Sequence, residues 1–457
     1  MDESYVVGAF TEIKKYHKFD FNLKKEQVIL LTKLCEKKST FGVLPTGYGK
    51  SMCFILAPLI MDKINPSNAP HIALVVSPLR SIMKDQDVFC RRHGIKSGVI
   101  TKKEEMTDET VSDIYNGKRT ILFASPEVLE QQSWRKMLLT KKYQASLCLL
   151  CFDEAHCVSN WGGNFRPEYR SVSSLTSLTT VPILWLTATC TSKMIAEILN
   201  VFNFELKDVE MVAVIPDRPN IFLNFKSVAR MSFEEELSLY IEHLSEKQLD
   251  AKKCIIYCRS IDCVGKIYLH MLERLGARAF VGEHIVKNRL IDQYHSVVDT
   301  DTEKRILDTF PLVTSTIRCL ICTVAFGMGV QVPDIDMVIH WGTPKDILSY
   351  WQEVGRCGRD GRIAEGHLLA FLPSLNRKRT EVEMIEMVNQ VKDGKCLRLA
   401  VLEALVTPGM DKKYLETLKN RPKCGNGICG LCSCCTTCKN SCKCNDISDV
   451  DMMNLKI

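Results

Sequence analysis

Short, almost wholly apolar runs alternate with charged stretches of helical length, and this alternation constrains the fold more than any other feature of the chain. Four such runs in the first half end in small or polar residues: HIALVVSP (71–78), RTILFASP (119–126), SLCLLCFDEAH (146–156) and VPILWLTAT (181–189). The stretches between them, such as SIMKDQDVFCRRHG, are long enough for amphipathic helices. Strands that are apolar on both faces and separated by helices are typical of a parallel sheet covered on both sides.

The same alternation begins again in the second half. The second set of expected strands is KKCIIYCRS (252–260), ARAFVG (277–282), RCLICTVAFG (318–327), DMVIHWG (336–342) and GHLLAFLP (366–373). We therefore predict an α/β fold with two tandem parallel-sheet lobes, residues 1–218 and 219–375, joined near Asp217-Arg218-Pro219-Asn220. A helical stretch and a cysteine-rich tail follow over residues 376–457. In open parallel sheets the functional loops lie at the carboxyl ends of the strands.

Length, charge and hydropathy set broad limits on function. A chain of 457 residues is too long for one compact core. No window approaches the roughly 20 uninterrupted apolar residues of a membrane span, and MDESYVVGAFTEIKKY lacks the features of a secretion signal. We expect an intracellular protein without a membrane partner. The net charge of +6 permits a polyanionic partner but does not demand one.

The segment GVLPTGYGKSMCF (42–54) predicts a phosphate-binding loop between an apolar stretch and a helix. Glycines let backbone N–H groups face a phosphate chain, Lys50 would neutralise the β and γ phosphates, and Ser51 would ligate Mg²⁺. The candidate residues are Thr46, Gly47, Gly49, Lys50 and Ser51. Leu44 stands where the strict pattern has its first glycine, so a simple glycine turn opening a helix is the alternative.

Two further motifs extend the predicted nucleotide site. Asp153 and Glu154 end an expected strand. One acid there can hold Mg²⁺ and the adjacent one can polarise the attacking water, although an isolated Asp-Glu pair is usually a solvated turn. In QEVGRCGRDGR (352–362), Arg356 and Arg359 would share a helix face and could stabilise charge on the γ-phosphate. The alternative for that segment is a basic helix surface.

In this order, these residues resemble the RecQ family of superfamily-two DNA helicases, over roughly residues 19–435. The resemblance depends on LPTGYGKS (44–51), VVSPLRSIMKDQ (75–86), DEAHCVSNWGGNFRPEYR (153–170), LTATCT (186–191), DRPNI (217–221), IIYCRS (255–260), VAFGMGVQVPDI (324–335) and QEVGRCGRDG (352–361). It implies two RecA-like lobes and an ATP-driven helicase that moves 3′ to 5′ along DNA. The implied cofactors are ATP and Mg²⁺, the partners are single-stranded and tailed duplex DNA, and the expected location is the nucleus.

The resemblance also assigns roles to single residues. Gln27 matches the family's adenine-recognising glutamine, and Lys24 stands where the family usually has arginine. Asp85 and Gln86 close a DNA-facing motif of the first lobe. The other residues implied in coupling the nucleotide to DNA are His156, Thr187, Ala188, Thr189, Gly327, Met328 and Gly329.

The loop after DEAH is the most specific part of the resemblance. The family's loop senses single-stranded DNA and passes that state to the adjacent metal site. Trp161 and Phe165 offer faces on which bases stack, at roughly 1–3 kcal/mol each, and Arg166 adds charge or a stacking plane. An ordinary surface loop with a half-buried tryptophan is the alternative.

The densest chemical signal is the cysteine cluster in KCGNGICGLCSCCTTCKNSCKC (423–444). Clustered cysteines in a reducing compartment indicate metal ligation more readily than disulfides, and Zn²⁺ takes four such ligands. The family's zinc module implies Cys396, Cys424, Cys429 and Cys432 as ligands. Cys435 could replace Cys424, and other frames or a second ion are open through Cys434, Cys435, Cys438, Cys442 and Cys444. We expect a zinc site here to fold the module and help hold duplex DNA.

The chain departs from the family in two places. In residues 277–305 Tyr294-His295 comes late, which indicates an insertion, so no site is assigned there. Many family members continue into a winged-helix domain and a further helical domain, and from its end at Ile457 we expect this chain to lack both. A DNA-stimulated ATPase or a zinc-module adaptor without strand separation is therefore the alternative function, and an RNA substrate is a lesser one.

Overall fold

A computed structural model describes the chain except residues 67–68, 161–166, 230–231, 328–331, 422–431 and 443–457. The chain divides into two compact units. The first unit consists of Met1–Pro216 with Leu405–Asp411, and the second of Asp217–Ala404 with Lys412–Ile457. The division falls two residues before the boundary placed after residue 218, and most of segment 376–457 is part of the second unit.

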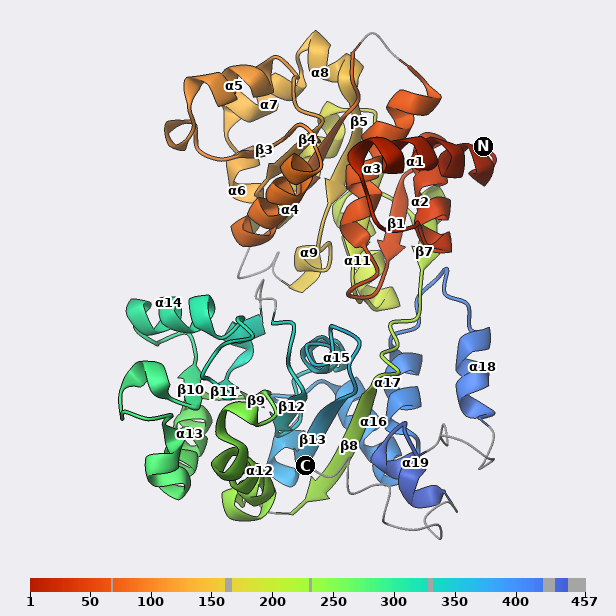
Figure 1. Cartoon of the computed structure of the whole chain (residues 1–457). Coiled ribbons are helices and arrows are strands. Elements are labelled where there is room, and N and C mark those ends of the chain that lie inside the picture. Colours follow the sequence, from red (N-terminus) through yellow and green to blue (C-terminus); the bar gives the residue numbers. More distant parts are fainter. Residues whose placement is uncertain (67–68, 161–166, 230–231, 328–331, 422–431, 443–457) are drawn as a thin grey trace. The chain divides into compact units, whose positions relative to one another are not determined.

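The first unit is built on a sheet of seven parallel strands in the order β3-β4-β2-β5-β6-β1-β7 (Figure 1). The strands are β1 (Thr40–Val43), β2 (Ile72–Val76), β3 (Ser97–Ile100), β4 (Ile121–Ala124), β5 (Leu147–Phe152), β6 (Ile183–Thr187) and β7 (Glu210–Ala213). The four apolar runs of the first half form β2, β4, β5 and β6. The predicted α/β fold with a parallel sheet is confirmed.

The helices of the first unit are α1 (Glu3–His17), α2 (Lys25–Cys35), α3 (Lys50–Ile64), α4 (Arg80–Arg92), α5 (Asp108–Tyr115), α6 (Pro126–Leu129), α7 (Gln132–Leu138), α8 (Lys141–Ser146), α9 (Cys157–Asn160), α10 (Pro167–Ser171) and α11 (Ser192–Val201). Helix α3 is apolar through its middle, and Cys53, Phe54 and Ile55 are fully buried. It packs against α1, α2 and the sheet in one continuous core, which holds the start of α3 in a fixed position.

The second unit contains six parallel strands in the order β10-β11-β9-β12-β13-β8. They are β8 (Ile221–Val228), β9 (Cys254–Cys258), β10 (Ile291–Tyr294), β11 (Cys319–Cys322), β12 (Met337–Trp341) and β13 (Ala364–Phe371). The longer helices are α12 (Phe233–Lys247), α13 (Ile261–Leu275), α14 (Thr300–Thr309), α15 (Ile347–Val354), α16 (Val382–Lys392), α17 (Leu397–Ala404), α18 (Lys413–Lys419) and α19 (Thr436–Ser441). Over the described ranges, no helix is both long enough and apolar enough to cross a bilayer.

One strand prediction in the second unit is wrong. Residues 277–282 form a 3₁₀ turn and a loop, in which Phe280 makes a single bridge to Arg289. The edge position of the sheet is taken by β10, whose Asp292 is buried and pairs with Arg305 at 2.7 Å. The extra residues seen in the sequence therefore precede this strand, and Tyr294 is its last residue.

Gly42 in β1 provides a test of how tightly the first sheet is packed. A Cβ at this position would lie 2.6 Å from Leu186 Cδ2 and 3.0 Å from Leu30 Cδ1, and both leucines are fully buried. We expect Gly42→Ala to lower the free energy of unfolding by about 1–3 kcal/mol through overpacking. The control is Gly98→Ala in β3, where the nearest side-chain atom is 3.9 Å away. Urea denaturation measures both, and equal losses would contradict the prediction.

Candidate functional site

The predicted phosphate loop connects β1 to the start of α3. Gly47 and Gly49 have φ angles of 78° and 83°, a left-handed conformation that glycine adopts without strain. Gly49 is the N-cap of α3, so Lys50 and Ser51 lie in its first turn. The N-terminus of a helix presents unpaired N–H groups and a partial positive charge, and this geometry favours a bound phosphate. Thr46 and Gly47 are exposed beside it.

Gln27 is hydrogen-bonded to the backbone of the predicted phosphate loop. The side chain is buried, and its amide donates to the carbonyl oxygens of Tyr48 at 3.1 Å and Gly49 at 2.9 Å. Its Oε1 accepts the backbone N–H of Lys24 at 2.8 Å. The Nζ of Lys24 lies 3.9 Å from the centroid of the Tyr48 ring, and the Tyr48 hydroxyl donates to Glu26. The two residues implied in adenine binding therefore lie directly against the phosphate loop.

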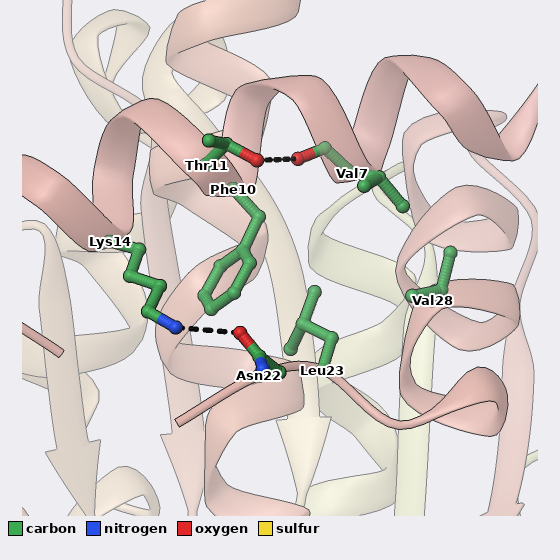
Figure 2. A pocket seen from close by; sticks show the side chains of 7 residues that line it. All are labelled: Val7, Phe10, Thr11, Lys14, Asn22, Leu23 and Val28. Carbon is green, nitrogen blue, oxygen red and sulfur yellow. Dashed lines mark hydrogen bonds between the residues drawn. The ribbon is translucent and has the colours of Figure 1, made fainter. Parts of the chain in front are cut away.

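A pocket of about 440 Å³ adjoins these residues (Figure 2). It lies between α1 and the segment that leads into α2, and Lys14 Nζ donates to Asn22 Oδ1 across it at 2.6 Å. Its lining residues are Val7, Phe10, Thr11, Lys14, Asn22, Leu23 and Val28. Leu23 directly precedes Lys24 and Val28 directly follows Gln27, so two lining residues flank the predicted adenine-binding residues in the chain.

Asp153 and Glu154 follow the last residue of β5. Asp153 is 4% exposed and its N–H donates to the Val76 carbonyl, while Oδ1 accepts the N–H of Glu154 at 3.0 Å. Burial and the neighbouring Glu154 carboxylate raise the pKa of Asp153 to about 7, although the charge of Lys50 opposes this shift. Glu154 has a φ of 50°, which is unusual for a residue with a side chain. Such strain and perturbed titration are common at functional sites.

Gln86 connects the two residues predicted to ligate Mg²⁺. Its Nε2 donates to Ser51 Oγ at 3.2 Å, and the same side chain lowers the pKa of the Asp153 carboxyl. The resemblance assigns Gln86 to a DNA-facing motif, whereas the structure places it within the nucleotide site. Nothing in its local sequence separates these two roles, because the contact depends on α4 and α3 starting beside the same edge of the sheet.

His156 links the acidic pair to the end of β6. Its Nδ1 lies 2.9 Å from Thr187 Oγ1 and 3.3 Å from Glu154 Oε2. The Thr187 hydroxyl already donates to the Thr189 carbonyl at 2.9 Å, so Nδ1 of His156 is the donor to Thr187. Burial lowers the pKa of His156, which keeps the ring neutral. The residues implied in coupling at 156, 187 and 189 are thus hydrogen-bonded in series.

Trp161, Phe165 and Arg166 lie outside the described residues, but both flanks of their loop are described. The Ser159 hydroxyl donates to Glu197 Oε2 at 2.5 Å, and Arg170 Nη2 donates to Glu197 Oε1 at 2.7 Å. One carboxylate on α11 therefore ties both flanks of segment 161–166. The sequence gives no signal for Glu197, because it lies more than twenty residues beyond the motif that it holds.

The arginine-bearing segment of the second unit is a loop, not the helix face that the sequence predicts. Helix α15 ends at Val354, and Arg356 and Arg359 lie in the turns that follow, both half-buried. Gly358 and Gly361 take left-handed φ angles of 59° and 90°, which a continuing helix does not allow, and Arg218 binds the carbonyls of Gly355, Cys357 and Gly358. Gly327 ends a short 3₁₀ segment in the same unit, and Met328 and Gly329 lie outside the described residues.

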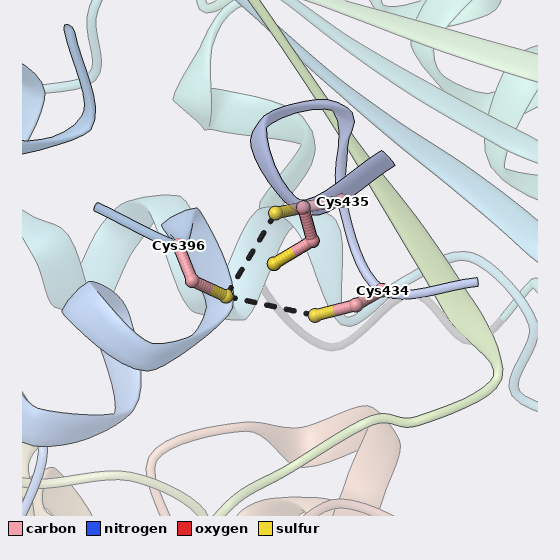
Figure 3. Close-up of side chains that lie close together, drawn as sticks. Cys396, Cys434 and Cys435 are labelled. Atoms are coloured by element: carbon pink, nitrogen blue, oxygen red, sulfur yellow. Dashed lines mark hydrogen bonds between the residues drawn. The ribbon is translucent and has the colours of Figure 1, made fainter. Parts of the chain in front are cut away.

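Four cysteines of the second unit form a compact group: Cys396, Cys434, Cys435 and Cys438. Their sulfur atoms all lie within 4.8 Å of one another. The sulfur of Cys396 is 3.6 Å from that of Cys434 and 3.8 Å from that of Cys435, and Figure 3 shows these side chains close together. Four thiolates at about 2.3 Å from a tetrahedral Zn²⁺ would lie about 3.8 Å apart. The separations are too long for a disulfide, and they fit a zinc site.

The group differs from the ligand set implied by the resemblance. Cys396 belongs to both sets, Cys424 and Cys429 lie outside the described residues, and Cys432 is described but is not a member. Long-range pairing explains the change. Leu223 N–H of β8 donates to the Cys434 carbonyl at 3.3 Å, which places Cys434 and Cys435 beside Cys396.

Comparison with known domains agrees with this site. A domain described as DEAD/DEAH box helicase matches residues 24–198, and one described as helicase conserved C-terminal domain matches residues 235–361. The first match contains the phosphate loop, the acidic pair and the Thr187 segment. The second contains both arginines of the loop after α15.

Similar proteins cover most of the chain. The ATP-dependent DNA helicase RecQ of Haemophilus influenzae is 29% identical over 83% of this chain and 58% of its own length. The putative ATP-dependent DNA helicase Q1 of Caenorhabditis elegans is 30% identical over 92% of this chain and 65% of its own length. The solved structure of the DUF1998 helicase MrfA bound to DNA and AMPPNP matches 95% of this chain and 57% of its own, with a TM-score of 0.61 at 16% identity, which shows the fold alone. The chain spans less than two thirds of each.

The raised pKa of Asp153 predicts a pH-dependent gain in stability for Asp153→Asn. Between about pH 4 and pH 7 the unfolded carboxyl ionises while the folded one stays protonated, so stability falls as the pH rises through this window. Asparagine removes that loss. We expect the ligand-free variant to be more stable than wild type at pH 8, by at most about 4 kcal/mol, with a smaller gain at pH 5.5.

Urea denaturation at the two pH values measures this gain, and the exposed Asp85→Asn is the matched control. Loss of stability in Asp153→Asn at pH 8, or an equal gain at both pH values, would show that the stability of the first unit does not depend on the cost of burying the ionised carboxylate.

Proposed function

We propose that this chain, which matches a DEAD/DEAH box helicase domain followed by a helicase conserved C-terminal domain, is an ATP-dependent 3′–5′ DNA helicase of RecQ type. Its relatives include proteins named as RecQ and Q1 DNA helicases. The observation that carries the proposal is the position of Gln86, which donates to Ser51 and lowers the pKa of Asp153. It brings the phosphate loop and the acidic pair into one site.

The residues of the first unit have separate tasks in this proposal. The loop N–H groups and Lys50 bind the phosphates, and Gln27 and Lys24 bind the adenine. Ser51 and Asp153 fit as ligands of a Mg²⁺ ion, which would neutralise charge on the β and γ phosphates. Glu154 polarises the attacking water. His156 and Thr187 connect this site to the motif at the end of β6.

The second unit supplies positive charge. We assign Arg356 and Arg359 to the γ-phosphate, where a guanidinium stabilises the charge that develops during hydrolysis. The proposed partners are single-stranded and tailed duplex DNA, with Trp161, Phe165 and Arg166 contacting the single strand. Contacts to the DNA backbone would make binding largely independent of sequence and sensitive to salt. A nuclear location follows from a DNA substrate.

Zn²⁺ is the third proposed cofactor. The sulfur separations and the Cys435-x-x-Cys438 spacing fit four-thiolate ligation by Cys396, Cys434, Cys435 and Cys438. A closed four-thiolate site stabilises a fold and leaves no position for a substrate. We therefore assign it to folding of the segment around α17 and α19 and to holding duplex DNA.

The proposed function predicts that single-stranded DNA stimulates ATP hydrolysis through the loop after DEAH. In Trp161→Ala the ratio of the stimulated to the basal rate is expected to fall toward one, because a stacking face is lost. Tyr16→Ala, which removes an exposed aromatic ring from α1, is the matched control and should keep the wild-type ratio. Lys50→Ala should abolish hydrolysis and so assigns the activity to this site.

A phosphate-release assay measures these rates, and strand displacement on a 3′-tailed duplex measures unwinding. If DNA leaves the rate unchanged, the coupling role of the loop is wrong. ATP turnover without strand displacement on any tailed duplex would favour the DNA-stimulated ATPase or adaptor instead.

The zinc proposal predicts that Cys438→Ser loses the ion bound by this group, whereas Cys432→Ser keeps it. Removing one of four ligands lowers affinity strongly and leaves the other thiolates without a common partner. Metal analysis of the purified variants measures zinc per chain. Retention of zinc by Cys438→Ser together with loss in Cys432→Ser would favour the ligand set implied by the resemblance.

A further inference from the structure

Arg398 is a buried charge at the centre of the second unit. Its side chain is 1% exposed and lies on α17, two residues after Cys396. It pairs with Asp217 Oδ1 at 2.6 Å and donates to the carbonyl oxygens of Arg218, Ile221 and Cys434. A charge removed from water needs partners of this kind, so Arg398 fixes segment 217–221 and the cysteine segment relative to α17.

Arg218 extends the same set of contacts to the arginine-bearing loop. Its guanidinium donates to the carbonyls of Gly355 at 2.8 Å, Cys357 at 2.9 Å and Gly358 at 2.7 Å. Asn220 adds bonds to the carbonyls of Gly358 at 2.9 Å and Arg362 at 2.8 Å. The backbone on either side of Arg356 is therefore held by residues of the Asp217–Asn220 segment.

These contacts form one continuous path within the second unit. It begins at the Cys434 carbonyl, passes through Arg398 to Asp217 and the Arg218 carbonyl, and ends where the Arg218 side chain holds the loop. The hydroxyl of Tyr414 in α18 also donates to Asp217 Oδ2 at 2.5 Å. A change in the position of Cys434 thus acts on the backbone of Arg356 through a series of direct polar contacts.

We propose that Arg398, Asp217 and Arg218 form a positioning relay through which metal occupancy of the cysteine group sets the geometry of the loop that carries Arg356 and Arg359. The inference rests on the proposed function, because it assigns a regulatory input to the same hydrolysis reaction. With the four cysteines held by a metal, the Cys434 carbonyl stays in reach of Arg398. Without the metal, Arg398 loses one anchor and the segment that orients Arg218 loosens.

Hydrogen exchange on the full chain tests the relay directly. Chelator-treated protein is compared with and without added Zn²⁺, and the readout is exchange of backbone amides in 355–362, a segment outside the cysteine group. We expect Zn²⁺ to slow exchange there in wild type. In Arg218→Gln, exchange in 355–362 should be fast with or without Zn²⁺, while the zinc content stays at the wild-type value.

Glu403→Gln is the matched control for this comparison. It removes the ion pairs of Glu403 with Lys395 at 2.7 Å and Lys419 at 3.2 Å, which belong to the same helical segment but not to the relay. Its amides in 355–362 should respond to Zn²⁺ as wild type does. Arg218 is the position to vary because it is half-buried and its loss keeps the buried pair, whereas Arg398→Gln leaves Asp217 without its charge partner.

Kinetics provides the second readout. Misplacement of a charge-stabilising group by about 1 Å can lower a rate on the order of 100-fold, so kcat of Arg218→Gln is expected to fall by about 10- to 100-fold with little change in KM for ATP. Zn²⁺ should raise kcat of the chelator-treated wild type and leave that of Arg218→Gln unchanged.

The relay and the proposed function fail in different ways. Zinc-dependent protection confined to 396–442, or no effect of Zn²⁺ on 355–362, overturns the relay even where ATP hydrolysis is normal. Wild-type kcat in Arg218→Gln also overturns it. A wild-type chain that hydrolyses no ATP but shows zinc-dependent protection of 355–362 rejects the proposed function and supports the relay.

Discussion

The parallel direction of every strand is the constraint on which the candidate site depends. Because neighbouring strands run the same way, their carboxyl ends meet at one edge of each sheet. In the first unit β2, β5, β6 and β1 are adjacent. Thr187 is the last residue of β6, and the segments that follow β2, β5 and β1 supply Gln86, Asp153 and Lys50 respectively. These four residues are up to about 140 positions apart in the sequence, as the numbers 50 and 187 show. The order of the strands in the sheet brings these residues together, and no local motif does so.

The carboxyl edge of the first sheet, where these groups meet, lowers the stability of the folded chain. Asp153 lies next to Glu154 in a buried setting that raises its pKa, and Glu154 itself takes a left-handed backbone conformation, which costs roughly 1 kcal/mol or more. The packing of α1, α2 and α3 on the sheet offsets this cost elsewhere in the unit. Such a site gains most when a cation neutralises the two acids, so the same residues that lower stability favour binding of a metal with the nucleotide.

The sequence predicts those strands whose positions a local run of apolar residues determines. The central strands β2, β5, β6, β9 and β12 are buried along their whole length and consist mostly of apolar residues, so the apolar runs of the sequence locate them. The edge strand β10 was missed because IDQY carries the buried Asp292, whose burial depends on Arg305 in α14. The cysteine group likewise involves the bond between Cys434 and β8, and the loop that carries Arg356 and Arg359 is bound by Arg218. In each case a partner outside the local segment is involved, and the local pattern does not contain it.

The buried pair of Arg398 and Asp217 is better explained by geometry than by stability. Bringing two charges out of water costs several kcal/mol, and apolar residues of similar size are often as stabilising at such positions. Apolar side chains could not, however, bind the carbonyls of Arg218, Ile221 and Cys434 at once, as Arg398 does. These carbonyls come from two segments that local sequence cannot align with each other. A rigid guanidinium with five donors is suited to that task, and its placement beside Cys396 makes the alignment depend on the state of the cysteine group.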